Sequence, residues 1–128
     1  MAEARPRRIR PPLRDVTPVE GAAAQRTDEE LMAGLLGQQI EALSALYDRY
    51  SSLVFSVSLR VLYDWQLAED VTQEVFLRLW QRPESYDPSR GRLLSWLMSV
   101  TRNRAIDERR RIGRRQRSEE GEEPMFEL

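Results

Sequence analysis

Apolar residues recur every three or four positions along much of this chain, which is the spacing of one face of an α-helix. The longest such run spans 38–63 and contains Ile40, Leu43, Tyr47, Tyr50, Val54, Val57 and Val61. A shorter helix is predicted just before it. Thr27 or Asp28 can cap its first turn, and Gly37 can end it.

Two more helices follow in the same pattern. Asp64 is a suitable N-cap for a helix over 65–81, and Pro83 stops that helix. A loop is predicted over 82–92, and a fourth helix over 93–112. The apolar face of the fourth helix contains Leu94, Leu97, Met98, Thr101, Ala105 and Ile112. No segment alternates as a strand does. The pattern therefore predicts an all-α fold, a compact bundle of three long helices plus one short N-terminal helix.

Composition divides the chain into a domain with two tails. Residues 1–27 hold four of the seven prolines and are predicted to be a disordered basic leader. Residues 28–113 form the helical domain. Residues 114–128 change from basic to acidic and are predicted to be a flexible linker or tail.

The formal net charge of −1 conceals strong local imbalance. Residues 1–27 carry a net charge of +3, 28–100 of −5, 101–117 of +6 and 118–128 of −5. All 20 basic residues are arginine, whose planar guanidinium suits phosphates and base edges. Alternating blocks of this kind indicate two partners of opposite character.

Several classes of protein are excluded by what the chain lacks. It contains no cysteine and no histidine, which removes disulfides, thiolate metal sites and the commonest general base. No Gly-rich phosphate loop is visible, so we expect no cofactor, no metal, no catalytic residue and no enzymatic activity. The apolar runs are too short to span a membrane, and the basic N-terminus has no apolar stretch after it. We expect a cytoplasmic protein without membrane insertion.

The helix predicted over 65–81 has two different faces. Its core face contains Leu67, Ala68, Val71, Thr72, Val75, Phe76 and Leu79. The opposite face contains Asp70, Gln73, Glu74, Leu77 and Gln81, so an exposed leucine lies among carboxylates and amides. Such a face is either plain solvated surface or a docking site for a basic partner. A docking face also explains the carboxylates of Glu69, Asp70 and Glu74 better than acid–base catalysis does.

The last helix and the loop before it carry candidate nucleic-acid contacts. The second half of the helix contains Arg102, Arg104, Arg109, Arg110 and Arg111, with Asn103 and Asp107 among them, and the basic run continues into Arg114, Arg115 and Arg117. These arginines form either a solvated basic face or a surface that follows a phosphate backbone. Asn103 can offer a donor and an acceptor to one base edge. Tyr86, Arg90, Arg92 and Trp96 are suited to stacking on unpaired bases, although Trp96 can equally belong to the core.

Three stretches, in this order and spacing, resemble region two of bacterial RNA polymerase sigma factors of the extracytoplasmic-function type. They are ALYDRYSSLVFSVSLRVL (45–62), AEDVTQEVFLRLWQR (68–82) and YDPSRGRLLSWLMSVTRNRAIDERRR (86–111). The second is the most specific. The resemblance covers about 28–111. It also implies a second helical domain that reads the −35 element and follows an acidic linker. The last residues resemble that linker, so we expect either a fragment of a longer protein or an unusual single-domain form.

The resemblance assigns roles to both surfaces. It implies that Asp70, Gln73, Glu74, Leu77 and Gln81 bind core RNA polymerase, on the clamp coiled coil of its largest subunit. It implies that the loop over 83–92 captures a base flipped from the non-template strand of the −10 promoter element. The helix after it would contact the upstream part of that element through Arg102, Asn103, Asp107 and Arg109 to Arg111. An inhibitory anti-sigma factor is a further implied partner.

Two other functions remain open on the residues alone. The chain could be a helical interaction module that binds an anti-sigma-type regulator and reads no DNA. It could also bind nucleic acid in general without polymerase. We expect a promoter-specificity subunit that recognises and melts the −10 element during transcription initiation.

Overall fold

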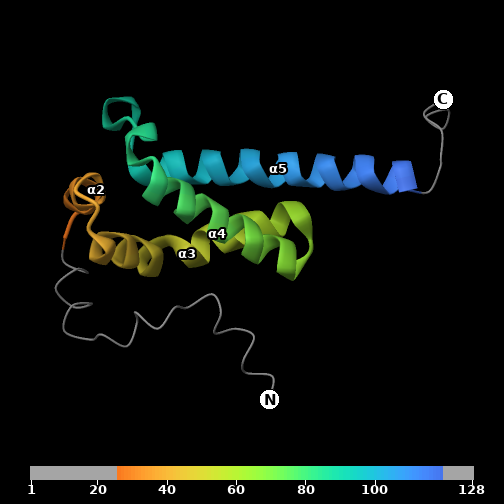
Figure 1. Cartoon of the computed structure of the whole chain (residues 1–128), viewed down its shortest axis with the longest axis horizontal. Helices are drawn as coiled ribbons and strands as arrows, with labels where there is room; N and C mark the ends of the chain where they lie inside the picture. The colour runs from red at the N-terminus through yellow and green to blue at the C-terminus, as the bar shows by residue number, and fades with distance from the viewer. Residues whose placement is uncertain (1–25, 120–128) are drawn as a thin grey trace, which may run out of the picture.

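The computed structural model describes residues 26–119, which form four α-helices (Figure 1). These are α2 (Asp28–Leu36), α3 (Ile40–Leu62), α4 (Trp65–Gln81) and α5 (Leu93–Glu119), with two 3₁₀ turns, η4 (Pro83–Ser85) and η5 (Pro88–Arg90), before α5. No strand occurs in this part of the chain. The predicted bundle of three long helices and one short N-terminal helix is confirmed. The predicted leader, 1–27, lies outside the described residues except for its last two positions.

Helix α2 begins and ends at the predicted residues. The Thr27 hydroxyl accepts a hydrogen bond from the Glu30 N–H at 3.1 Å, and the Glu30 carboxylate accepts one from the Thr27 N–H at 3.0 Å. This capping box satisfies two donors that the first helical turn would otherwise leave unpaired. Gly37 caps the other end.

Helix α2 is fastened to α3 by apolar and polar contacts. Leu31 and Leu35 are fully buried. Asp28 forms an ion pair with Arg49 at 2.7 Å and accepts a hydrogen bond from the Tyr50 hydroxyl at 2.6 Å. The short helix therefore has a fixed position on the bundle.

Helices α3 and α4 are joined by a tight turn. Helix α3 starts two residues later than the predicted 38–63, because Gln38 has a left-handed backbone with φ 59°. Tyr63, also left-handed at φ 53°, ends it. The Asp64 carboxylate then accepts a hydrogen bond from the Leu67 N–H at 2.9 Å, so α4 has the predicted N-cap and the predicted bounds.

The core lies between α3, α4 and α5, with α2 closing one end. Of the predicted core face of α4, Leu67 is half-buried and the other six residues are buried. Glu69 is only 1% exposed, so the expectation that it belongs to the exposed docking face is wrong. On a helical wheel it falls between Phe76 and Trp80, at the edge of the apolar face, and packing covers it.

Helix α5 is longer than predicted. It continues from 112 to Glu119 and extends past the α3–α4 turn (Figure 1). The added residues include Arg114, Arg115, Gln116 and Arg117, which are good helix formers, and cations near a helix C-terminus are favoured by its dipole. The flexible linker predicted from 114 therefore begins with ordered helix. Across 26–119, every helix is too short or too polar to cross a bilayer.

Candidate functional site

The outer face of α4 carries the five predicted docking residues. Asp70, Gln73, Glu74, Leu77 and Gln81 are all exposed, and Leu77 is 51% exposed. An apolar side chain surrounded by polar and acidic groups is a common arrangement at protein interfaces. The fold therefore presents these side chains together on one surface.

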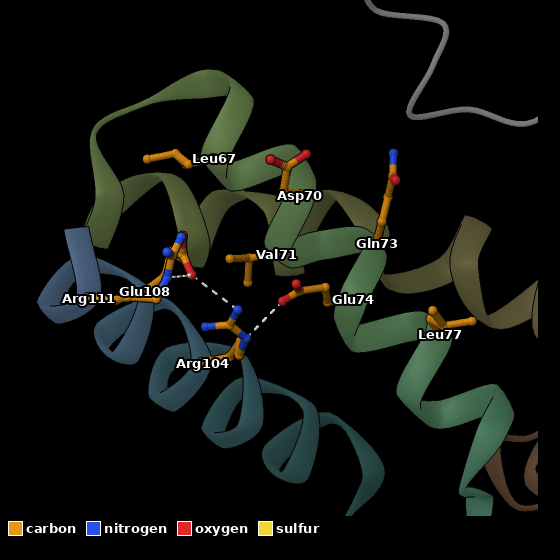
Figure 2. Close-up of a pocket in the computed structure, with 9 residues that line it drawn as sticks. All are labelled: Leu67, Asp70, Val71, Gln73, Glu74, Leu77, Arg104, Glu108 and Arg111. Carbon is orange, nitrogen blue, oxygen red and sulfur yellow. Dashed lines mark hydrogen bonds and ion pairs between the residues drawn. The ribbon is translucent and has the colours of Figure 1, made fainter. Parts of the chain in front are cut away.

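An ionic network links this face to α5. The Arg104 guanidinium lies 2.8 Å from the Glu74 carboxylate and 3.1 Å from that of Glu108, and Arg111 pairs with the other oxygen of Glu108 (Figure 2). Burial disfavours the charged form of Arg104 and so lowers its pKa. The hydrogen bonds to Glu74 and Glu108 have a larger combined effect, so the pKa of Arg104 is raised. The two pairs within α5 follow helical spacing. The pair between helices could not be inferred from sequence spacing.

Glu108 is the buried centre of that network. Its side chain is 8% exposed. The hydrogen bond from Arg111 lowers the pKa of Glu108, burial opposes this, and the bond from Arg104 adds to the lowering. Glu108 in turn raises the pKa of Arg111. Arg111, predicted to contact DNA, is thus already paired within the domain.

A pocket of about 560 Å³ lies where α4 meets α5 (Figure 2). Its lining combines four of the predicted docking residues with side chains from both helices: Leu67, Asp70, Val71, Gln73, Glu74, Leu77, Arg104, Glu108 and Arg111. In Figure 2, Asp70 and Gln73 point away from α5, whereas Glu74 points toward Arg104. The docking face therefore continues into a cleft that α5 helps to form.

The other predicted DNA contacts of α5 lie outside this pocket. Arg102, Asn103, Asp107, Arg109 and Arg110 are exposed. A groove of about 540 Å³ brings Arg109 and Arg110 together with Ile106, Gly113, Arg114 and Arg117. Arg102, Asn103 and Asp107 do not line this groove. Arg114 and Arg117 belong to the basic run that the sequence shows, although the family resemblance assigns them no contact.

The loop between α4 and α5 and the first turns of α5 line a third pocket, of about 340 Å³. Four predicted residues line it together: Tyr86, Arg90, Arg92 and Trp96. The rings of Tyr86 and Trp96 lie 5.6 Å apart between centroids, in a tilted arrangement. Trp96 is half-buried and packs against the core, as one of its two interpretations expects, and its stacking on a base stays a prediction.

Tyr86 forms a wall of this pocket, and its ring is not freely exposed. Tyr86 is 9% exposed, and its hydroxyl donates a hydrogen bond to the Gly91 carbonyl at 2.7 Å. Burial, followed by the charges of Glu29, Asp28 and Asp87, raises its pKa. Gly91 has φ 146°, a conformation that favours glycine. The hydrogen bond and the glycine both favour this conformation of the loop.

Asp87 stabilises the loop locally. Its carboxylate accepts hydrogen bonds from the Ser89 hydroxyl at 2.8 Å and from the Ser89 N–H at 3.0 Å. These bonds, the hydroxyl first, lower the pKa of Asp87. The carboxylate also lines the pocket, beside Arg90 and Arg92. The pocket thus has aromatic walls and a rim that carries charges of both signs.

No group of three or more acidic side chains suited to a metal ion occurs within residues 26–119. The three surfaces described above have the chemistry of macromolecular binding: an acidic face with an exposed leucine, a basic groove, and a small aromatic pocket.

Comparison with known proteins agrees with this chemistry. The model of the Sigma-70 region 2 family matches residues 46–115. The chain is 37% identical over 77 residues to the ECF RNA polymerase sigma factor SigK of Mycobacterium sp. (strain KMS), covering 60% of this chain and 40% of that protein. It is 32% identical over 79 residues to SigK of Mycobacterium tuberculosis (strain H37Ra), covering 62% and 42%. The chain thus spans about 40% of the length of these relatives. No solved structure matches it significantly.

Proposed function

Because the chain belongs to the Sigma-70 region 2 family, we propose that it is the domain of an extracytoplasmic-function sigma factor that docks on core RNA polymerase and opens the −10 promoter element. Proteins of this family are polymerase subunits rather than enzymes, in agreement with the expected lack of a catalytic site. The observation that carries the proposal is the separation of two surfaces on one bundle: α4 exposes Leu77 among acidic groups, and α5 exposes guanidinium groups on another side.

The docking step uses the face of α4. Leu77 supplies apolar area, and Asp70 and Glu74 supply charges that favour a basic partner. The partner is the clamp coiled coil of the largest polymerase subunit. Because this surface belongs to a helix whose opposite face is buried, its backbone is held in position before binding.

Strand opening uses the loop and α5. Arginines such as Arg109 and Arg110 neutralise phosphates of the non-template strand, and Asn103 reads a base edge. A base that leaves the stack enters the pocket beside Tyr86 and Trp96. Extrusion costs a few kcal/mol, which capture of the base must offset. A base that fits the pocket is therefore selected while the duplex is melted.

Docking is tested with the full chain and mycobacterial core polymerase. The triple variant Asp70→Ala, Gln73→Ala, Glu74→Ala should bind roughly tenfold more weakly or worse, since it removes the polar contacts around Leu77. Its helical circular dichroism should be unchanged, because all three side chains are exposed. The control Glu29→Ala, Glu41→Ala removes two exposed carboxylates elsewhere. Equal binding by the triple variant and this control would refute the docking assignment.

DNA reading is tested with labelled single strands that are randomised over the −10 positions. Selection of particular bases by the chain, strengthened by polymerase, supports the proposal. A module that binds only a regulator would bind no strand under either condition. A general nucleic-acid binder would bind all strands tightly without polymerase. The two alternatives therefore give results that differ from the proposal and from each other.

A further inference from the structure

The Glu74–Arg104 ion pair joins the docking face of α4 to α5. The Glu74 and Arg104 side chains are 51% and 35% exposed. Pairs this accessible contribute little to stability, because water and salt screen them and two long side chains must be ordered. The effect of this pair is therefore on the position of the Glu74 side chain.

The pair fixes one oxygen of Glu74 and leaves the other accessible. Oε1 accepts the Arg104 Nε–H at 2.8 Å, and among residues 26–119 no donor bonds to Oε2. A glutamate that is ordered in advance loses less side-chain freedom when a partner binds. Glu74 also lies at the pocket between α4 and α5, where the apolar side chains of Leu67 and Val71 line the same space (Figure 2).

Arg104 is poorly placed to act as a DNA contact. Successive residues of a helix point about 100° apart, so Arg104 lies on a different side of α5 from Asn103. Its guanidinium is held between two carboxylates and lines the α4–α5 pocket rather than the outer basic groove. The arginines of α5 thus form two sets, one facing outward and one facing α4.

We propose that Arg104 is a positioning residue for polymerase docking, which holds the Glu74 carboxylate at the edge of the α4–α5 pocket so that Oε2 meets a cationic side chain of the polymerase. This inference rests on the proposed docking function. It extends the docking surface from one helix to two, and it separates Arg104 and Arg111 from the arginines assigned to DNA.

The experiment measures the affinity of the full chain for mycobacterial core polymerase. Arg104→Gln should weaken binding roughly three- to tenfold, because the glutamate must then be ordered on binding. The matched control is Arg60→Gln, which removes one exposed guanidinium from α3, outside the pocket. The control should bind polymerase as the wild type does. Arg104→Gln and Arg60→Gln having equal affinities would overturn the inference.

A double-mutant cycle separates positioning from a direct or general effect. If Arg104 acts through Glu74, then Arg104→Gln should cause no further loss in a Glu74→Gln background. An equal loss in both backgrounds would contradict the inference. The exchanged pair Glu74→Arg, Arg104→Glu should bind polymerase poorly, because it presents the wrong charge. Its thermal unfolding midpoint should fall, because Arg104→Glu also places a carboxylate beside that of Glu108. Recovery of binding by the exchanged pair would also overturn the inference.

The polymerase affinities of the variants distinguish a failure of the proposed docking function from a failure of the role proposed for Arg104. If the variant Asp70→Ala, Gln73→Ala, Glu74→Ala binds polymerase normally, the proposed function itself is wrong. If that variant binds weakly and Arg104→Gln binds normally, only the role of Arg104 is wrong.

Discussion

The Tyr50 hydroxyl donates a 2.6 Å hydrogen bond to the Asp28 carboxylate, and this bond fastens the short helix α2 to α3. Burial, together with the hydrogen bond and the negative charge of Asp28, raises the pKa of Tyr50 from 10.0 to about 12. The protonated phenol is therefore favoured in the folded state. The stability that it contributes is fully present below pH 10 and is lost as the pH rises toward 12.

High pH should consequently lower the free energy of unfolding of the wild type more than that of a Tyr50→Phe variant. The variant should lose about 1 kcal/mol of unfolding free energy at pH 7, and the difference between the two proteins should shrink between pH 10 and 12. Urea unfolding at a series of pH values measures this difference. Tyr63→Phe is the control, because Tyr63 is 82% exposed. A constant difference in unfolding free energy over that range would contradict the coupling of Tyr50 ionisation to stability.

Glu108 should make the stability of the fold depend on pH in the opposite direction, with the loss at low pH. Its pKa in the folded state lies below the ordinary 4.5, chiefly because of Arg111. Its contribution to stability is therefore present above pH 4.5 and is lost as the pH falls through the lowered folded value. Glu108→Gln should cost roughly 1–3 kcal/mol at pH 7 and much less at pH 3, as measured by urea unfolding. The exposed Glu41→Gln is the control, and a pH-independent cost for Glu108→Gln would contradict the prediction.

Local signals predicted the fold well because each of them acts within one helical turn. Thr27 and Asp64 cap their helices through hydrogen bonds to residues three positions away, and Pro83 follows the end of α4. The sequence does not predict the end of α5, because a run of arginines is compatible with a charged linker as well as with a helix. Arginine is a good helix former, so a change in charge there did not mean a change in backbone.

The candidate site was predictable only in part, because pairing between helices depends on packing. The exposed face around Leu77 followed from helical periodicity alone. The burial of Glu69 and the contact of Arg104 with Glu74 depend on how α4 and α5 approach each other, which spacing along the chain does not determine. The pocket that Tyr86 and Trp96 share likewise depends on the path of the loop.

The hydroxyl of Tyr86 should matter for DNA binding and not for docking. It holds the loop closed through the Gly91 carbonyl at 2.7 Å. Tyr86→Phe keeps the ring and removes this bond, so stability should fall by about 1 kcal/mol and capture of a flipped base should weaken. Fluorescence anisotropy of −10 non-template strands, with polymerase bound, tests this prediction. Unchanged DNA affinity together with the expected loss of stability would show that the loop pocket does not hold the base.

Asn103 and Arg110 should affect DNA binding in different ways. Both are exposed on α5, but an amide can read a base edge, whereas a guanidinium in the basic groove meets phosphates. Asn103→Ala should change the preferred −10 sequence, with a discrimination loss of about 1–3 kcal/mol at one position. Arg110→Ala should weaken binding to all sequences alike and reduce the slope of log affinity against log salt by about one. Titrations of matched and mismatched strands at several salt concentrations measure both quantities. If Asn103→Ala weakened all strands equally, or Arg110→Ala changed preference and left the salt slope intact, the division of α5 into reading and phosphate-binding residues would be wrong.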